Sequence, residues 1–279
     1  MPVVNLPTKR IKITPQYYIV KKEIKKSGLH TICEQARCPN IFECFSKKQV
    51  TFLILGDTCS RGCSFCAVKK GRPQDVDKSE PQKIAQFVEK FEIRNVVITS
   101  VCRDDLEDYG AQQFMEVIAE IKKLNRDIKI EVLIPDFKGK ANLIAKVVHS
   151  GIDVVSHNLE TVPRLSPVVR KGASYNLSLR VLKIIKEIDR NMLTKSALLL
   201  GMGEEPAEVL DTIEDIRKTG CDVLVLGQYL KPHRNSWEVK KILTHDEFRY
   251  YKQQALKMGF KMVFADTWAR SSNCNCFSM

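Results

Sequence analysis

Short apolar runs alternate with amphipathic stretches along most of the chain. The run at residues 50–56 is apolar and ends in glycine, as a buried strand does, and similar runs follow at 95–101, 128–134, 152–156, 194–200 and 222–226. Between them apolar residues return at helical spacing near 84–91, 114–121, 177–188, 209–216 and 247–258. The pattern predicts six strands alternating with helices, with a last apolar stretch at 262–265.

The predicted strands read as continuous apolar runs instead of alternating patterns. This is typical of a parallel sheet covered on both faces, and therefore of an α/β fold. The sheet is either doubly wound or a barrel of the TIM type. No G-x-G-x-x-G follows the first predicted strand, which weakens the dinucleotide-binding version of the doubly wound fold.

The composition is that of an ordinary globular protein. Of 279 residues, 44% are hydrophobic and 28% charged, which excludes a mostly disordered chain. No apolar run approaches the roughly 18–20 residues of a membrane helix. The first residues show neither a signal-peptide core nor an Arg- and Ser-rich presequence, so we expect a reducing cytoplasm.

Half of the net charge of +12 lies at the start of the chain. Residues 1–26 contain one acid, Glu23, and seven bases: Lys9, Arg10, Lys12, Lys21, Lys22, Lys25 and Lys26. This segment is either a solvated surface arm or a docking surface for an acidic partner. The chain shows no helix-turn-helix or RNA-binding signature, so nucleic acid is not an expected partner.

The ten cysteines carry the clearest chemical signal, because in a reducing compartment clustered cysteines indicate metal binding or catalysis before disulfides. Six of them form two triplets, spaced x4 and x5 and then x3 and x2: Cys33, Cys38 and Cys44, followed by Cys59, Cys63 and Cys66. Three thiolates can hold three irons of a cubane cluster. The fourth iron then needs another ligand.

A structural zinc site is the alternative. Such sites prefer four closed ligands in paired C-x2-C units, and only Cys63 and Cys66 make such a pair. None of the five histidines lies at the spacing from either triplet that a zinc finger would need. Cys102 and Cys221 lie next to predicted strands, as core cysteines do, and the tail adds Cys274 and Cys276 as spare thiols or ligands.

The second triplet, with Phe65 before its last cysteine, resembles the hallmark of the radical S-adenosylmethionine (SAM) superfamily. In that superfamily three thiolates hold a 4Fe-4S cluster and SAM chelates the fourth iron. The first triplet, within Gly28-Leu-His-Thr-Ile-Cys33-Glu, resembles the auxiliary-cluster motif of the lipoyl synthase family. Further resemblance to that family lies at 51–57, 103–106, 133–137, 157–164, 194–196 and 227–232.

The resemblance implies a partial TIM-type (β/α)6 barrel at 50–260. It further implies an N-terminal extension at 1–49 with the auxiliary-cluster cysteines, and a tail at 261–279 with an Arg-Ser-Ser motif. The implied activity is radical SAM insertion of two sulfurs at carbons 6 and 8 of a protein-bound octanoyl-lysine, giving lipoyl-lysine. The implied cofactors are two 4Fe-4S clusters and SAM.

The implied partners follow from that reaction. They are octanoylated lipoyl-carrier proteins, namely acyltransferase subunits of 2-oxo acid dehydrogenases and the glycine-cleavage carrier protein. An electron donor protein and an iron–sulfur carrier for cluster resupply are also implied. Neither nucleic acid nor membrane is expected.

Residue roles also follow from the resemblance. The family's fourth auxiliary-cluster ligand is a serine, which corresponds here to Ser272 in Arg270-Ser271-Ser272. Arg164 is expected to neutralise the SAM carboxylate or to orient substrate. The expected SAM contacts are Phe65, Asn158, Glu160, Lys195, Gly201 and Glu204.

The tail departs from the family pattern. Asn273 stands where a tyrosine is usual, and Cys274 and Cys276 follow it. Thiolate is a better iron ligand than a serine oxygen, so either cysteine is an alternative to Ser272. Two other functions stay open: a diverged two-cluster radical SAM enzyme acting on another acyl or thiolated substrate, and a non-enzymatic zinc-binding module.

Overall fold

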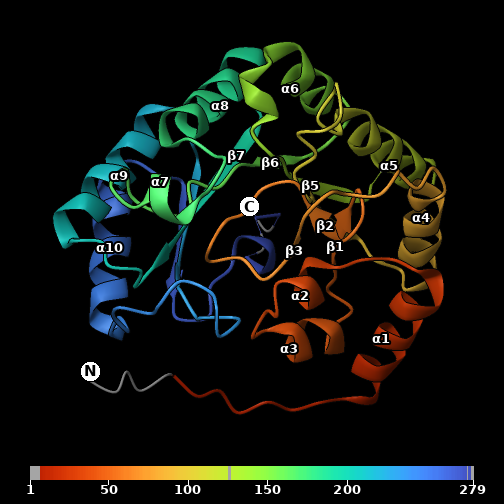
Figure 1. Ribbon diagram of the computed structural model, residues 1–279, viewed down its shortest axis with the longest axis horizontal. Helices are drawn as coiled ribbons and strands as arrows, with labels where there is room; N and C mark the ends of the chain where they lie inside the picture. The colour runs from red at the N-terminus through yellow and green to blue at the C-terminus, as the bar shows by residue number, and fades with distance from the viewer. Residues whose placement is uncertain (1–6, 125–126, 275, 278–279) are drawn as a thin grey trace. The chain divides into compact units, whose positions relative to one another are not determined.

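The computed structural model describes residues 7–124, 127–274 and 276–277 (Figure 1). The chain divides into two compact units. We call Arg10–Arg61 with Ala67–Val155 the amino-terminal unit, and Gly62–Cys66 with Ser156–Ser278 and the first nine residues the carboxy-terminal unit. Each is described by itself.

Parallel strands form the centre of the amino-terminal unit. β1 (Thr51–Ile54) pairs with β4 (Asn95–Ser100), and β4 pairs with β5 (Lys129–Leu133). β1 is buried throughout, as its apolar run predicts. A short parallel pair, β2 (Thr58–Cys59) with β3 (Lys69–Lys70), lies outside this sheet.

Helices cover these strands. α4 (Glu80–Lys90), α5 (Ala111–Leu124) and α6 (Ala141–Val148) each bury one apolar stripe, and α4 and α5 pack side by side (Figure 1). η1 (Phe137–Gly139) follows β5.

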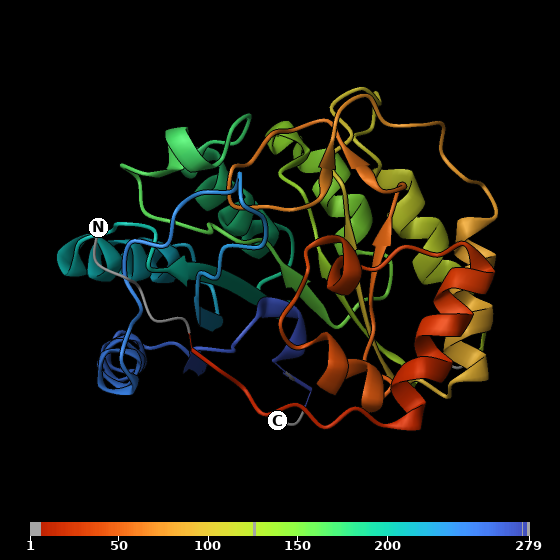
Figure 2. The ribbon, with the colours of Figure 1, turned by 60° about the horizontal axis from the view of Figure 1, so that its bottom comes forward.

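Three further helices precede β1. They are α1 (Pro15–Ser27), α2 (Ile32–Gln35) and α3 (Ile41–Ser46). α1 runs alongside α4 (Figure 2) and is tied to it by an ion pair of 2.7 Å between Lys90 Nζ and Glu23 Oε2.

The carboxy-terminal unit repeats the alternation. β7 (Leu193–Leu200), β8 (Val223–Gln228) and β9 (Met262–Asp266) are parallel neighbours. Its helices are α7 (Ser166–Val169), α8 (Tyr175–Ile188), α9 (Pro206–Lys218) and α10 (His245–Lys257), and the tail forms η2 (Ser271–Asn273).

The strand order decides between the two α/β architectures. With β6 (Val154–Ser156), the seven strands follow the order β1-β4-β5-β6-β7-β8-β9, which is their order along the chain. A doubly wound sheet reverses its order at a switch point, whereas a TIM-type sheet runs through it in sequence. The α/β fold of the partial TIM type is therefore confirmed.

Every predicted strand is present, and the apolar stretch at 262–265 is a seventh strand, β9. The sequence pattern did not predict α6, because its eight residues are too few for the helical repeat to be distinguished from a short apolar run. The division at 49 and 260 stays a prediction. No helix in the described ranges is both long and apolar enough to cross a membrane.

Candidate functional site

The first cysteine triplet lies on two short helices of the amino-terminal unit. Cys33 is in α2, which begins where the Thr31 hydroxyl accepts the Glu34 N–H at 3.2 Å. The Cys38 N–H donates to the Cys33 carbonyl at 3.0 Å. Cys44 follows in α3. Cys38 and Cys44 lie near enough to Cys33 to affect the ionisation of its thiol.

The electrostatics of this triplet suit a cationic cluster. Burial, together with the nearby thiols of Cys38 and Cys44, raises the pKa of the Cys33 thiol to about 12, although hydrogen bonding from Thr51 opposes the rise. Cys33 is buried, and Cys38 and Cys44 are half-buried. Neighbouring thiols of this kind lose their protons together only if positive charge compensates them. Iron supplies that charge, so these residues fit an iron–sulfur cluster.

A single metal ion fits the described residues less well. Among them, no three His, Cys, Asp or Glu side chains are grouped closely enough to bind one ion. A cubane spreads its irons over several ångströms, which allows thiolates to stand further apart than around one zinc. All ten cysteines are free thiols.

Cys59 begins the second triplet, in β2 of the amino-terminal unit. Its sulfur accepts the N–H groups of Arg61 and Cys102, each at 3.4 Å. A hydrogen bond from the Cys102 thiol is the main cause that lowers the pKa of Cys59 to about 6, against the opposing effect of burial. Such a thiol gives up its proton readily to a metal.

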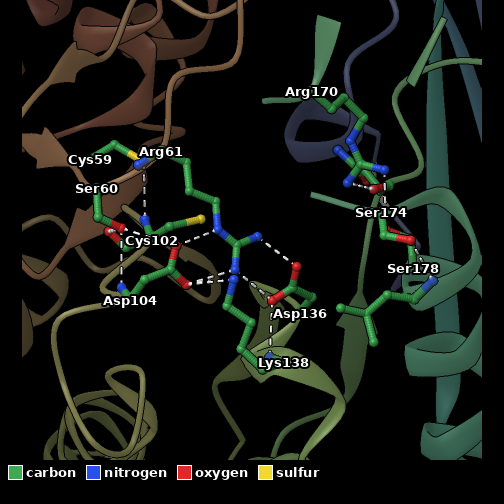
Figure 3. A network of polar contacts seen from close by, with 12 residues as sticks. Cys59, Ser60, Arg61, Cys102, Asp104, Asp136, Lys138, Arg170, Ser174 and Ser178 are labelled. Carbon is green, nitrogen blue, oxygen red and sulfur yellow. Dashed lines mark hydrogen bonds and ion pairs between the residues drawn. The ribbon is translucent and has the colours of Figure 1, made fainter. Parts of the chain in front are cut away.

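Arg61 joins three loops that follow strands (Figure 3). Its guanidinium donates to both Asp104 oxygens at 2.7 and 2.8 Å, and to both Asp136 oxygens at 2.5 and 2.8 Å. Asp104 follows β4 and Asp136 follows β5, so the two carboxylates hold the loop that leaves β2. The arginine and Asp136 are almost fully buried.

The segments 103–106 and 133–137 were matched to the family, but nothing in the sequence gave them a role. In the structure they supply the two carboxylates that Arg61 binds. The sequence signal that points to this network is the position of each Asp directly after a predicted strand, because parallel strands end at the same edge of a sheet.

Cys63 and Cys66 belong to the carboxy-terminal unit. The Ser64 N–H donates to the Val169 carbonyl at 2.8 Å, and the Ser64 carbonyl accepts the Trp237 N–H at 2.9 Å. Phe65 packs against the apolar core of this unit. The turn between the two cysteines is therefore held by its two middle residues.

Glu160 and Asn158 follow β6. The Asn158 amide donates to Glu160 Oε1 at 3.0 Å. Burial raises the pKa of Glu160, although the positive charges of Arg170 and Arg270 and the bond from Asn158 oppose this. Glu160 thus lies between two arginines, one of which belongs to the Arg-Ser-Ser motif.

Gly201 and Glu204 form a tight turn after β7. The Glu204 carboxylate accepts the N–H groups of Gly201 and Met202, the latter at 2.9 Å. A Cβ on Gly201 would stand 2.3 Å from both Gln228 Nε2 and the Lys241 carbonyl. This position therefore requires glycine for close packing. The Glu204 carboxylate stabilises the turn by accepting hydrogen bonds from the main chain of the same turn.

Lys195, in β7, lies entirely inside the carboxy-terminal unit. Its ammonium donates to the Ser271 carbonyl at 2.7 Å. Gly227, in β8, allows the Ala269 carbonyl to approach, since a Cβ there would stand 2.2 Å from that oxygen. Lys195 and Gly227 thereby hold the tail against β7 and β8. Ser272 lies in this tail, in η2.

Arg164 is engaged elsewhere. Its guanidinium donates twice to Glu208, at 2.7 Å each, and once to the Gly203 carbonyl at 2.8 Å. The side chain is half exposed. The expected contacts of Arg164, Lys195, Phe65, Asn158, Glu160, Gly201 and Glu204 with SAM or substrate stay predictions.

Residues 53–216 match the family described as the Radical SAM superfamily. A lipoyl synthase of Caldicellulosiruptor saccharolyticus is 51% identical over 94% of this chain and 92% of its own length. A lipoyl synthase of Aquifex aeolicus is 49% identical over 91% of this chain and 92% of its own length.

Solved structures share the fold at low identity. SuiB of Streptococcus suis, in its complex with S-adenosylmethionine, has a TM-score of 0.61 and 12% identity over 89% of this chain and 61% of its own. Methylornithine synthase has a TM-score of 0.57 and 14% identity over 78% of this chain and 71% of its own. Together with the two cysteine triplets, the sequence relatives place the chain in the lipoyl synthase family of the radical SAM superfamily.

Proposed function

We propose that this enzyme inserts sulfur at carbons 6 and 8 of an octanoyl group carried on a lysine of a carrier protein. Its family membership already establishes a sulfur-inserting radical SAM enzyme that uses a 4Fe-4S cluster, SAM and an octanoylated carrier protein. The observation that supports the finer proposal is the proximity of Cys38 and Cys44 to the buried Cys33, which would allow the three thiolates to hold a second cluster.

The second triplet is proposed to hold the cluster that binds SAM. Cys59, Cys63 and Cys66 would each give one thiolate, and a SAM-loaded cluster supplies the 5′-deoxyadenosyl radical that removes hydrogen from an unactivated carbon. No side chain is basic enough to do so, which is why a cofactor is needed. Arg61 holds the loop at Cys59 through its two carboxylates.

The first triplet is proposed to hold the auxiliary cluster, with Ser272 as the fourth protein ligand. A serine oxygen is a harder and weaker ligand for iron than thiolate. Its place in the tail, where Lys195 binds the preceding carbonyl, gives this ligand a defined backbone. Phe65, Asn158 and Gly201 are proposed to line the SAM site, with Glu160, Lys195 and Glu204 around them.

The finer partners belong to the same proposal. The carriers would be acyltransferase subunits of 2-oxo acid dehydrogenases and the glycine-cleavage carrier protein. An electron donor protein would reduce the SAM-binding cluster, and an iron–sulfur carrier would restore the auxiliary cluster. The electron donor and the iron–sulfur carrier follow from the chemistry, since the reaction consumes electrons and sulfur, whereas the carriers follow from the family resemblance.

An anaerobic turnover assay tests the proposal. The cluster-loaded enzyme is mixed with an octanoyl-lysyl peptide, SAM and a reductant, and the peptide is analysed by mass spectrometry. We expect a dithiol product and two 5′-deoxyadenosines per product, because two carbons each lose a hydrogen. Cleavage of SAM without any change in the peptide, followed by turnover of a different acyl substrate, would favour the diverged enzyme instead.

A further inference from the structure

The outer face of α1 combines exposed apolar and cationic side chains. Tyr18 is 61% exposed and Ile19 53%. In the described part of the chain, four of the seven exposed large hydrophobic residues fall within nine positions: Ile11, Ile13, Tyr18 and Ile19. Such clustering indicates an interaction surface, whereas single exposed apolar residues do not.

The helix periodicity separates two faces of α1. Tyr17, Val20 and Ile24 are buried. At 100° per residue, Lys22 points away from them, with Tyr18 and Ile19 one turn before it. Lys25 and Lys26 lie one turn after it, and all these outer residues are exposed. We call Tyr18, Ile19, Lys22, Lys25 and Lys26 the outer face of α1.

The charge of this face is uncompensated within its own segment. Residues 10–27 contain six bases and a single acid, Glu23. That acid is the partner of Lys90 in α4. The outer face therefore attracts a partner that carries acidic groups around an apolar centre.

The position of α1 connects this face to the first cysteine triplet. Tyr17 packs against Phe42 and Phe45 of α3, with ring centroids 5.1 and 6.0 Å apart. Cys44 lies on the same short helix. A protein bound to the outer face of α1 would therefore dock on a helix that packs directly against the helix that carries Cys44.

We propose that the outer face of α1 docks the acidic face of the octanoylated carrier domain. This rests on the proposed function, in which the auxiliary cluster gives its sulfur to the carrier's octanoyl chain. An electron donor has a different target, the cluster held by Cys59, Cys63 and Cys66. A membrane surface fits less well, since the continuous apolar stripe of α1 is already buried in the protein.

Equilibrium binding tests the proposal. The triple variant Lys22→Glu, Lys25→Glu, Lys26→Glu is titrated with an intact octanoylated carrier domain. We expect its Kd to rise at least about tenfold at low salt, with a much smaller difference at high salt. The milder Lys22→Gln, Lys25→Gln, Lys26→Gln variant should fall between it and the wild type. Tyr18→Ser with Ile19→Ser should weaken binding at every salt concentration.

A matched control changes the same charge elsewhere. Lys183, Lys252 and Lys257 are exposed on α8 and α10, so their triple replacement by Glu should leave carrier binding within about twofold. Turnover of a short octanoyl-lysyl peptide should be unchanged in all variants. Iron content and the thermal unfolding curve show whether each variant is folded.

The outcomes separate the docking proposal from the proposed function. Wild-type enzyme that turns over neither peptide nor carrier contradicts the function. Wild-type activity with an unchanged carrier Kd in the Glu and Gln variants overturns the docking site. Normal carrier binding with slowed reduction by an acidic electron donor, or with lost binding to anionic lipid vesicles, would assign the face to that partner and overturn the proposal.

Discussion

At the residue scale, Arg61 has a role that its place in the motif conceals. It stands between Cys59 and Cys63 of the second triplet, and the family pattern specifies only the spacing of the cysteines there. In the fold its side chain is almost buried and forms paired hydrogen bonds with Asp104 and Asp136 (Figure 3). Paired hydrogen bonds of this kind fix the orientation of the arginine side chain, in addition to neutralising its charge.

Arg61→Gln should destabilise the protein by about 3 kcal/mol, because it leaves the buried carboxylate of Asp136 without its cation. Urea unfolding measures this cost. The double variant Arg61→Gln, Asp136→Asn should recover part of the loss. If Arg61→Gln unfolds at the wild-type urea concentration, the network does not hold the loop.

Ser272 is the second residue whose role can be tested alone. Ser272→Ala should keep SAM cleavage but reduce sulfur insertion by a factor on the order of 10–100, because the auxiliary cluster loses a ligand. Cys274→Ala and Cys276→Ala serve as controls and should remain largely active. A Mössbauer spectrum that shows a fourth thiolate on the auxiliary cluster, lost in one of these two variants, would move the ligand from Ser272 to that cysteine.

At the scale of elements, the tail is an ordered part of the carboxy-terminal unit. η2 lies on β7, where Lys195 binds the Ser271 carbonyl, and close to β8 at Gly227. The Arg270 N–H is held by the Asn273 side chain at 2.9 Å. Asn273, where the family has tyrosine, thereby stabilises the turn that contains Ser272.

Lys195→Met should loosen this turn while it preserves the volume of the side chain. We expect faster amide hydrogen exchange at Arg270 and Asn273, and loss of iron from the auxiliary cluster only. The exposed Lys252→Met in α10 is the matched control. Unchanged exchange in the tail, or equal loss of both clusters, would contradict a positioning role for Lys195.

At the scale of the whole molecule, we expect the two thiol triplets to have separate tasks. Replacing Cys59, Cys63 and Cys66 by Ala should leave about four irons per chain and abolish SAM cleavage. Replacing Cys33, Cys38 and Cys44 by Ala should also leave about four irons but keep abortive SAM cleavage. Iron analysis and 5′-deoxyadenosine measurement test both expectations. Loss of SAM cleavage in both variants, each with a cluster, would refute this division.

Local sequence alone was enough to predict the strands of the main sheet in order, most of the helices between them, the α/β class and the two triplets. The partial TIM-type barrel followed from the family resemblance. Short-range patterns carry this information, because apolar periodicity reports on burial and thiolate spacing reports on metal chemistry. Even Ser272 could be proposed from a three-residue motif.

Only the tertiary structure decided which polar side chains meet. Arg61 and Asp136 are 75 residues apart, and Lys195 and Ser271 are 76 apart. These contacts depend on the strand order and on where each strand ends, and no local pattern records that geometry. For the same reason the sequence did not predict that the Lys195 ammonium binds the Ser271 carbonyl of the tail. The contact of Lys195 with SAM, which the family resemblance implies, stays a prediction.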